Sequence, residues 1–135
     1  MEKALAVAKT GIAEIDAQHQ KLLADLERFE LWMRKGFALA ATFDALEALF
    51  AYAETHFEYE EDFLREHAYP KFEAHAAQHR DFIRQIGELR RSLEAGEDVA
   101  EQLAAAMRAW IVGHINDEDV EYANFLRHGW PPARA

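Results

Sequence analysis

The chain has 135 residues, half of them apolar, with 25 acidic against 15 basic side chains and a formal net charge of −10. This length predicts a single domain over residues 1–135 whose core needs no disulfides, and so acidic a surface disfavours nucleic-acid binding. There is no cysteine, which excludes disulfide bonds, thiolate zinc sites, iron–sulfur clusters and a cysteine nucleophile. Apolar runs are too short for a secretion signal or a bilayer span, so we expect a cytoplasmic protein without membrane insertion.

Apolar residues recur every three or four positions along most of the chain, which predicts long helices and no strand. A short N-terminal arm, residues 1–11, precedes the first predicted helix, residues 12–35. Gly36 stands where a glycine often terminates a helix. The second helix is expected over residues 42–67, with Thr42 as its N-cap.

The second half of the chain repeats this pattern. Pro70 suits the first turn of a helix over residues 70–93, and Gly96 marks the next break. The last helix is predicted over residues 98–128. Four long helices joined by short connections favour an all-α fold, an up-down-up-down four-helix bundle.

Potential metal ligands interrupt the apolar faces of all four predicted helices. They are His19, His56 with Glu60, His75 with His79, and His114, which is followed by a run of acids that offers a second carboxylate. A single core histidine is more often a hydrogen-bonded core residue than a ligand, and pairs four apart also occur on solvated helix faces. Burying all of these groups together without compensation would be costly, and a bound metal removes that cost by using their lone pairs. The two other histidines, His67 and His128, lie near helix ends, where a positive charge suits the helix dipole, and receive no role.

The ligand types suit iron, manganese, zinc or cobalt. Five imidazoles and two carboxylates exceed what one first-row ion accepts, so two ions are indicated. If both carboxylates bridge the ions, together with an oxo or hydroxo group, the histidines must divide three and two. The ion with two histidines then keeps one position for a small ligand.

The order His, His-x-x-x-Glu, His-x-x-x-His and His-x-x-x-x-Asp resembles the hemerythrin family, specifically its single-domain bacterial members. The resemblance covers residues 11–122, nearly the whole chain. It implies two non-haem iron ions, bridged by carboxylates and an oxo or hydroxo group, with dioxygen bound at the two-histidine iron. The ligand set that it implies is His75, His79 and His114 for one iron, His19 and His56 for the other, and Glu60 and Asp119 as bridges.

Apolar side chains near these positions predict a dry pocket for oxygen, which would resist the entry of water. They are Leu22, Leu23, Phe57, Trp110, Ile111 and Ile115. Ordinary core packing explains the same residues equally well, and the two interpretations are compatible.

Two features depart from the family pattern or from regular geometry. The family's arm carries a tryptophan before a Gly-Ile pair, whereas no aromatic residue precedes Gly11 and Ile12. In a regular helix Asp119 lies about 140° around the axis from His114, and Glu118 would face the core instead. We therefore predict a local π-bulge between His114 and Asp119.

Reversible dioxygen binding is the function that these residues favour, for storage, delivery or sensing. A histidine-rich site donates less negative charge than the sites of di-iron oxygenases, which disfavours the high-valent iron needed to split the O–O bond. The alternatives are a di-iron oxidase, peroxidase or nitric-oxide-reactive enzyme, or a sensor of oxygen, redox state or iron. No base or substrate motif is evident, so we expect a binding protein, monomeric or a small homo-oligomer, whose protein recipient of oxygen the sequence does not identify.

Overall fold

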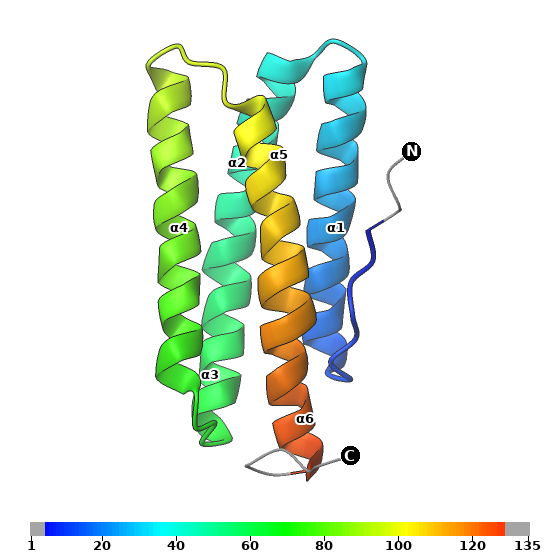
Figure 1. Ribbon diagram of the computed structural model, residues 1–135, viewed down its shortest axis with the longest axis vertical. Helices are drawn as coiled ribbons and strands as arrows, with labels where there is room; N and C mark the ends of the chain where they lie inside the picture. The colour runs from blue at the N-terminus through cyan, green and yellow to red at the C-terminus, as the bar shows by residue number, and fades with distance from the viewer. Residues whose placement is uncertain (1–4, 129–135) are drawn as a thin grey trace.

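Four helical rods pack side by side, each running opposite to its sequence neighbour, as the computed structural model shows (Figure 1). The structure describes residues 5–128, without the ring of His128, so the predictions for that ring and for residues 1–4 lie outside it. This part of the chain contains no strand, and none of its helices is long and apolar enough to cross a membrane. The predicted all-α, up-down-up-down bundle is confirmed.

Two of the four rods are α-helices interrupted by a π-helical segment. In chain order the elements are α1 (Ala13–Arg34), α2 (Ala38–Tyr52), η1 (Ala53–Phe57), α3 (Glu58–Glu66), α4 (Phe72–Glu94), α5 (Ala100–Ala109), η2 (Trp110–Asp119) and α6 (Val120–His128). The second rod is α2, η1 and α3, and the fourth is α5, η2 and α6. Apart from the start of the second rod, the rod boundaries fall within two residues of those predicted.

The second rod begins at Ala38, four residues before the predicted start. The prediction that Thr42 is an N-cap is wrong, because this residue is buried inside α2 and its hydroxyl donates to the Ala38 carbonyl oxygen at 2.6 Å. Residues 38–41 read Ala-Leu-Ala-Ala, and alanine and leucine lose little on entering a helix. The helix therefore starts directly after Phe37, without a side-chain cap.

Three of the rods are followed by a residue in the left-handed backbone conformation. Gly36 and Gly96 follow α1 and α4 with φ values of 91° and 92°, the conformation that glycine adopts without steric cost. In the α3–α4 connection Ala68 takes this place at φ 53°, where a Cβ is unfavourable. Pro70 lies in the turn that precedes α4 rather than in the first turn of the helix as predicted, because proline suits the second position of a turn closed by a hydrogen bond from Phe72 N to the Tyr69 carbonyl.

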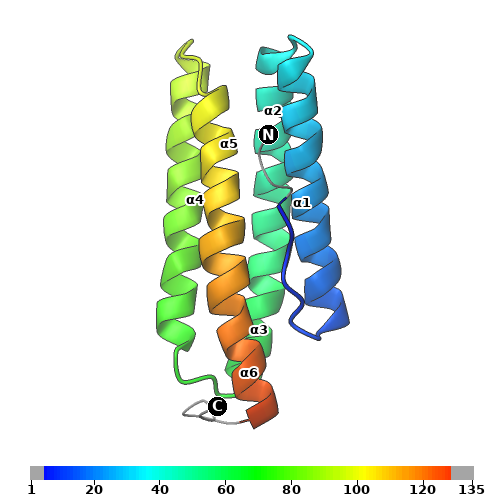
Figure 2. The same cartoon turned by 45° about the vertical axis from the view of Figure 1, so that its right-hand side comes forward.

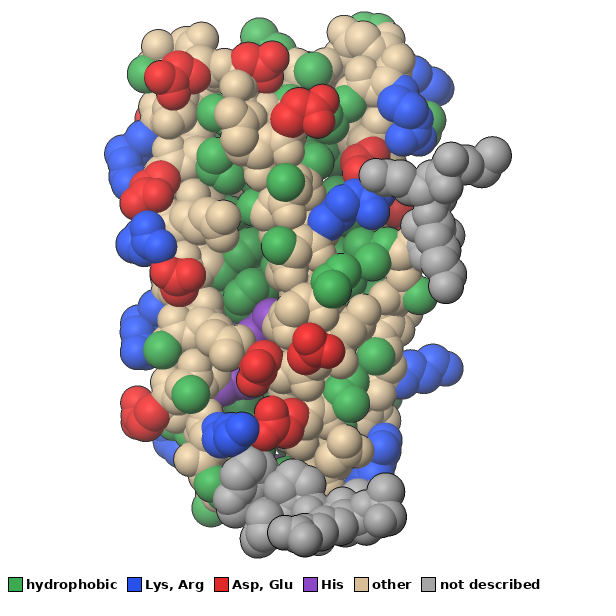
Figure 3. Space-filling view, in the orientation of Figure 1, with side chains coloured by type: hydrophobic (Ala, Val, Ile, Leu, Met, Phe, Trp, Pro, Cys, Tyr) green, Lys and Arg blue, Asp and Glu red, His purple; other side chains and the backbone are tan. Residues whose placement is uncertain are grey.

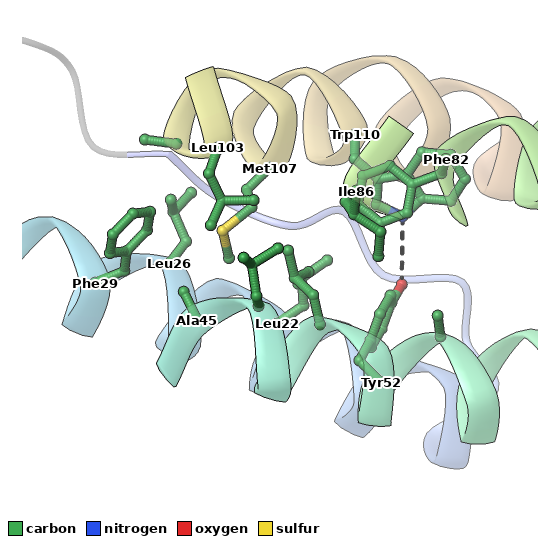
Figure 4. Close-up of a cluster of buried hydrophobic side chains, with 14 of the residues drawn as sticks. Leu22, Leu26, Phe29, Ala45, Tyr52, Phe82, Ile86, Leu103, Met107 and Trp110 are labelled. Atoms are coloured by element: carbon green, nitrogen blue, oxygen red, sulfur yellow. Dashed lines mark hydrogen bonds between the residues drawn. The ribbon is translucent and has the colours of Figure 1, made fainter. Parts of the chain in front are cut away.

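Two apolar clusters fill the interior, and a polar level separates them. Along α1, Ile15 belongs to the smaller cluster and Leu22 to the larger one, with His19 between them. The larger cluster includes the side chains labelled in Figure 4: Leu22, Leu26, Phe29, Ala45, Tyr52, Phe82, Ile86, Leu103, Met107 and Trp110. The smaller consists of Ile15, Leu64, Tyr69, Tyr122 and Ala123. Apolar packing therefore seals the polar level from above and below.

The described part of the arm runs along α1 and is held by the fourth rod (Figure 2). The side-chain amide of Asn116, in η2, accepts a hydrogen bond from Ala8 N at 2.8 Å and donates one to the Ala6 carbonyl oxygen at 3.0 Å. Leu5 and Val7 pack against the larger cluster. An asparagine clamp and two aliphatic residues thus anchor an arm that lacks the expected tryptophan.

Candidate metal centre

All seven side chains predicted as ligands meet at the polar level between the two apolar clusters. Each of them is at most 4% exposed. They are His19 from α1, His56 from η1, Glu60 from α3, His75 and His79 from α4, and His114 and Asp119 from η2. Every rod of the bundle therefore contributes to one buried cluster.

One oxygen of each carboxylate faces the histidines of α4 and η2. Glu60 Oε1 lies 2.5 Å from His75 Nε2 and 3.0 Å from His79 Nε2. Asp119 Oδ1 lies 3.0 Å from His75 Nε2 and 3.1 Å from His114 Nε2. Five residues thus point nitrogen and oxygen lone pairs at one small volume, which we call the three-histidine group.

The other oxygen of each carboxylate faces the remaining two histidines, the two-histidine group. Glu60 Oε2 lies 3.1 Å from His56 Nε2, and Asp119 Oδ2 lies 3.0 Å from His19 Nε2. The two imidazole Nε2 atoms are 3.2 Å apart. Each carboxylate therefore spans both groups, which is the arrangement that two ions sharing bridging ligands require.

Several buried nitrogen and oxygen atoms of the cluster make no hydrogen bond of acceptable geometry within the described residues. They are Nε2 of His114 and both carboxylate oxygens of Asp119, which face the cluster, together with Nδ1 of His19. Unsatisfied buried polar atoms are rare in native proteins because each one is costly. Imidazole nitrogen and carboxylate oxygen are suitable ligands for iron and its neighbours, so the residues present fit a metal centre.

Without a metal, the surroundings shift the pKa values of the cluster's side chains in different directions. Burial acts to raise the pKa of Glu60 and Asp119, but the histidines beside their oxygens outweigh it and hold both pKa values well below their usual range. Burial acts to lower the pKa of His75, yet hydrogen bonds to the two carboxylates raise it to about 10. Burial dominates at His56 and lowers its pKa. Both carboxylates are therefore ionised and available as ligands.

Neighbouring side chains fix the orientation of the histidine rings. His79 Nδ1 donates to Glu61 Oε2 at 2.8 Å, and His114 Nδ1 donates to Gln78 Oε1 at 2.6 Å. A ring whose Nδ1 carries the proton keeps its Nε2 lone pair free for a metal. Both rings therefore present Nε2 toward the cluster.

His56 Nδ1 is held in the same way by the side-chain oxygen of Gln18. Sequence reasoning missed this group of partners, although Gln18 and Gln78 each directly precede a predicted ligand in the chain. Their positions in the sequence do not reveal these contacts, because the side chain of each glutamine contacts a histidine on a neighbouring rod and not the histidine that follows it in the chain.

Three of the histidine rings are each covered by a nearly parallel aromatic ring. The pairs, with distances between ring centroids, are Phe57 and His79 at 4.0 Å, Trp110 and His114 at 3.9 Å, and Tyr52 and His56 at 4.8 Å. Figure 4 shows the Trp110 indole N–H donating to the Tyr52 hydroxyl at 3.4 Å. Tyr52 thus lies against a predicted ligand, a contact that the sequence analysis did not foresee.

The six residues predicted to form an oxygen pocket are all buried in the larger apolar cluster: Leu22, Leu23, Phe57, Trp110, Ile111 and Ile115. Their packing role is thereby established, and their role toward oxygen stays a prediction. In Figure 3 histidine side chains are visible at the floor of the groove between α4 and the fourth rod, so the cluster lies shallowly beneath this face.

The predicted irregularity between His114 and Asp119 is confirmed. Both lie in η2, a ten-residue π-helix, and the i to i+5 bonding of a π-helix brings residues five apart to nearly the same face. Asp119 is completely buried, whereas Glu118 is partly exposed. A second π-helical segment, η1, contains His56 and was not predicted.

Comparisons with known proteins agree with this geometry. The family described as hemerythrin HHE cation binding domain matches residues 10–126. The chain is 33% identical to a bacteriohemerythrin of Pseudomonas aeruginosa over 88% of its own length and 77% of that protein's. It is 31% identical to a bacteriohemerythrin of Stenotrophomonas maltophilia, over 87% of this chain and 76% of the relative. A bacteriohemerythrin of Clostridium acetobutylicum is 30% identical, over 83% of this chain and 91% of the relative.

Proposed function

This chain belongs to the hemerythrin family, and we propose that its buried cluster holds two iron ions and binds dioxygen reversibly. The observation that carries the proposal is the position of the two carboxylates. Glu60 and Asp119 each turn one oxygen toward the three-histidine group and the other toward the two-histidine group. Two iron ions bound there would supply the electrons that dioxygen takes up on binding.

The two groups differ in the number of protein ligands that they offer. The proposed ligand sets are His75, His79 and His114 for one ion, His19 and His56 for the other, and Glu60 and Asp119 for both. With shared bridges, the two-histidine side has one protein ligand fewer. A small ligand such as dioxygen is therefore expected on that side.

The surrounding residues keep the site dry and its ligands oriented. Leu22, Ile111 and Ile115 are fully buried next to the histidines, and such a shell excludes water and protects a reactive centre. Glu61 and Gln78 hold the protons on the outer nitrogens of two histidine rings. These contacts support a preformed site that needs little rearrangement to bind its ligand.

We favour a carrier or storage protein, acting in the cytoplasm, over a di-iron oxidase, a peroxidase or a sensor. Five of the seven proposed ligands are neutral imidazoles, and so little anionic charge disfavours the high-valent iron that O–O cleavage requires. The sharpest distinction between these functions is whether the bound ligand can be removed without oxidation of the site.

The test is an absorption spectrum of the iron-loaded, reduced protein, recorded without oxygen, after oxygen is admitted and after purging, together with its iron content. We expect two iron ions per chain and a visible band that appears with oxygen and disappears on purging. His79→Ala should abolish the band, whereas His67→Ala, which alters an exposed ring at the end of α3, should leave it unchanged. Irreversible oxidation on first contact would favour the enzyme, and an iron-free protein would refute the site.

A further inference from the structure

Large apolar side chains are exposed together where α1 meets α2, at the opposite end of the bundle from the start of α1. They are Leu31, Trp32, Phe37, Leu39 and Phe43, between 41% and 66% exposed. Isolated exposed apolar residues are ordinary, but a contiguous group marks an interaction surface. Trp32 and Phe37 are in contact, with ring centroids 5.5 Å apart, and Leu39 and Phe43 line one hollow, so most of them are grouped in space as well as in sequence.

The helix beneath this surface, α2, has the composition of a helix that is buried on both sides. α2 carries only two charged side chains, Asp44 and Glu47, among its 15 residues. Leu46 and Leu49 face the core, while Leu39 and Phe43 face outward. A helix that is apolar around most of its circumference is usually buried, which indicates that something packs on the outer face of α2.

The segment between α1 and α2 and the α4–α5 connection carry opposite charges. Residues 31–43 include Arg34 and Lys35 but no acid, although the whole chain has a net charge of −10. Across a hollow of about 580 Å³, lined by Leu39 and Phe43 among others, lie the acids Glu97 and Asp98 of the α4–α5 connection. Figure 3 shows basic side chains over the end of α1 and acidic ones over that connection.

A second copy of the chain complements this pattern. A two-fold axis running along the hollow would bring the apolar residues of both copies together. It would also place the basic side of each copy over the acidic side of the other, as a self-complementary interface requires. An anionic lipid surface would meet Glu97 and Asp98 directly and be repelled by them.

We propose that the protein forms an end-to-end homodimer through this loop-end surface, which comprises Trp32, Phe37, Leu39 and Phe43 flanked by Lys35 and Glu97. Stable complexes bury about 800 Å² per partner, and this surface rests on only four large side chains, so we expect a weak, concentration-dependent dimer. It leaves the groove over the histidines uncovered in both copies. The proposal does not depend on what the metal centre binds.

Sedimentation equilibrium of the full chain over a range of concentrations tests the interface. The unaltered protein should show a monomer–dimer equilibrium. Leu39→Glu and Phe43→Glu, each burying a charge in the interface, should weaken dimerisation by about tenfold or more, equivalent to about 1.4 kcal/mol. Val112→Glu is the matched control, because Val112 is also an exposed apolar residue, 52% exposed, but lies in η2 outside the surface. Circular dichroism verifies that all variants fold.

A charge exchange then tests the orientation of the two copies. Lys35→Glu and Glu97→Lys should each weaken the dimer by placing like charges opposite one another, and the double variant should restore it. A protein that is monomeric at every concentration overturns the proposal, and so does a dimer that Leu39→Glu and Phe43→Glu leave unchanged. Binding of a monomeric protein to vesicles of phosphatidylcholine and phosphatidylserine would instead assign the surface to lipid.

Discussion

The phenolic O–H of Tyr122 donates a 3.0 Å hydrogen bond to Oε2 of Glu60, the oxygen that faces the two-histidine group. Both side chains are completely buried, so no water replaces the bond if it is lost. Tyr122→Phe should therefore lower the free energy of unfolding by about 1 kcal/mol, measured by urea denaturation, and weaken iron binding. Tyr59→Phe, at an exposed position, should change neither, and equal effects of both variants would contradict this role for Tyr122.

The outer partners of the histidine rings are expected to affect metal affinity without changing the ligands. Gln78→Ala removes the acceptor of the His114 Nδ1 proton, so the ring loses the contact that fixes its orientation. We expect roughly 10- to 100-fold weaker iron binding, measured by competition with a chelator. Gln85→Ala, an exposed position on the same helix, serves as the control, and unchanged affinity in Gln78→Ala would show that the contact is dispensable.

The π-helical segment predicts which of two adjacent acids binds metal. Asp119→Asn should lose most of its iron, because this carboxylate contacts histidines of both groups. Glu118→Gln should keep its iron, since this side chain is partly exposed whereas Asp119 is completely buried. Metal analysis of the two purified proteins decides the matter, and the reverse outcome would mean that the fourth rod is regularly helical.

The stability of the iron-free protein should depend on pH through His75. Burial acts to lower the pKa of His75, but hydrogen bonds to Asp119 and Glu60 raise it from 6.5 to about 10. A raised pKa means that the protonated ring contributes stability in full below pH 6.5 and that this contribution is lost as the pH rises to about 10. The free energy of unfolding should therefore fall over this window.

Iron binding should cancel that pH dependence. A metal-bound histidine is neutral, so iron loading at neutral pH displaces the proton from His75. Chemical denaturation of the iron-free and iron-loaded proteins at several pH values provides the comparison. An iron-free protein whose stability is constant or rises between pH 6.5 and 10 would contradict the raised pKa of His75.

The α3–α4 connection offers a stabilising substitution. Ala68 is exposed and has a φ of 53°, a region that L-residues adopt at a cost. Ala68→Gly should raise the free energy of unfolding by about 0.5–1 kcal/mol, since the relief of strain exceeds the added chain entropy. Ala77→Gly, in the exposed middle of α4, should lower it by about 1 kcal/mol. Thermal denaturation should move in opposite directions for the two variants.

The four rods were predictable because a helix in a bundle repeats its apolar face along the chain. The buried polar cluster was predictable for a related reason: His19 or His79 on such a face breaks a pattern that local sequence defines. The start of α2 was mispredicted because Thr42 has the chemistry of a cap, while the alanines before it extend the helix. Local sequence is therefore sufficient to predict the four rods and the buried polar cluster, but not the end of every helix.

Contacts between rods account for what the sequence did not reveal. Gln18 and Gln78 act on rings that lie 38 and 36 residues away in the chain, and only the packing of the bundle joins them. Tyr52 is indistinguishable from a core residue until its ring is found against His56. The segment η1 was unexpected because nothing in its composition distinguishes a π-helix from an α-helix.

The π-helical turn of the fourth rod has a consequence for protein design. His114 and Asp119 stand five positions apart, and that spacing is specific to the wider winding of η2. Copied unchanged into an idealised bundle of regular helices, the same residues would aim the aspartate away from its partners. A grafted site would need one residue deleted between the two, so that His-x-x-x-x-Asp becomes His-x-x-x-Asp.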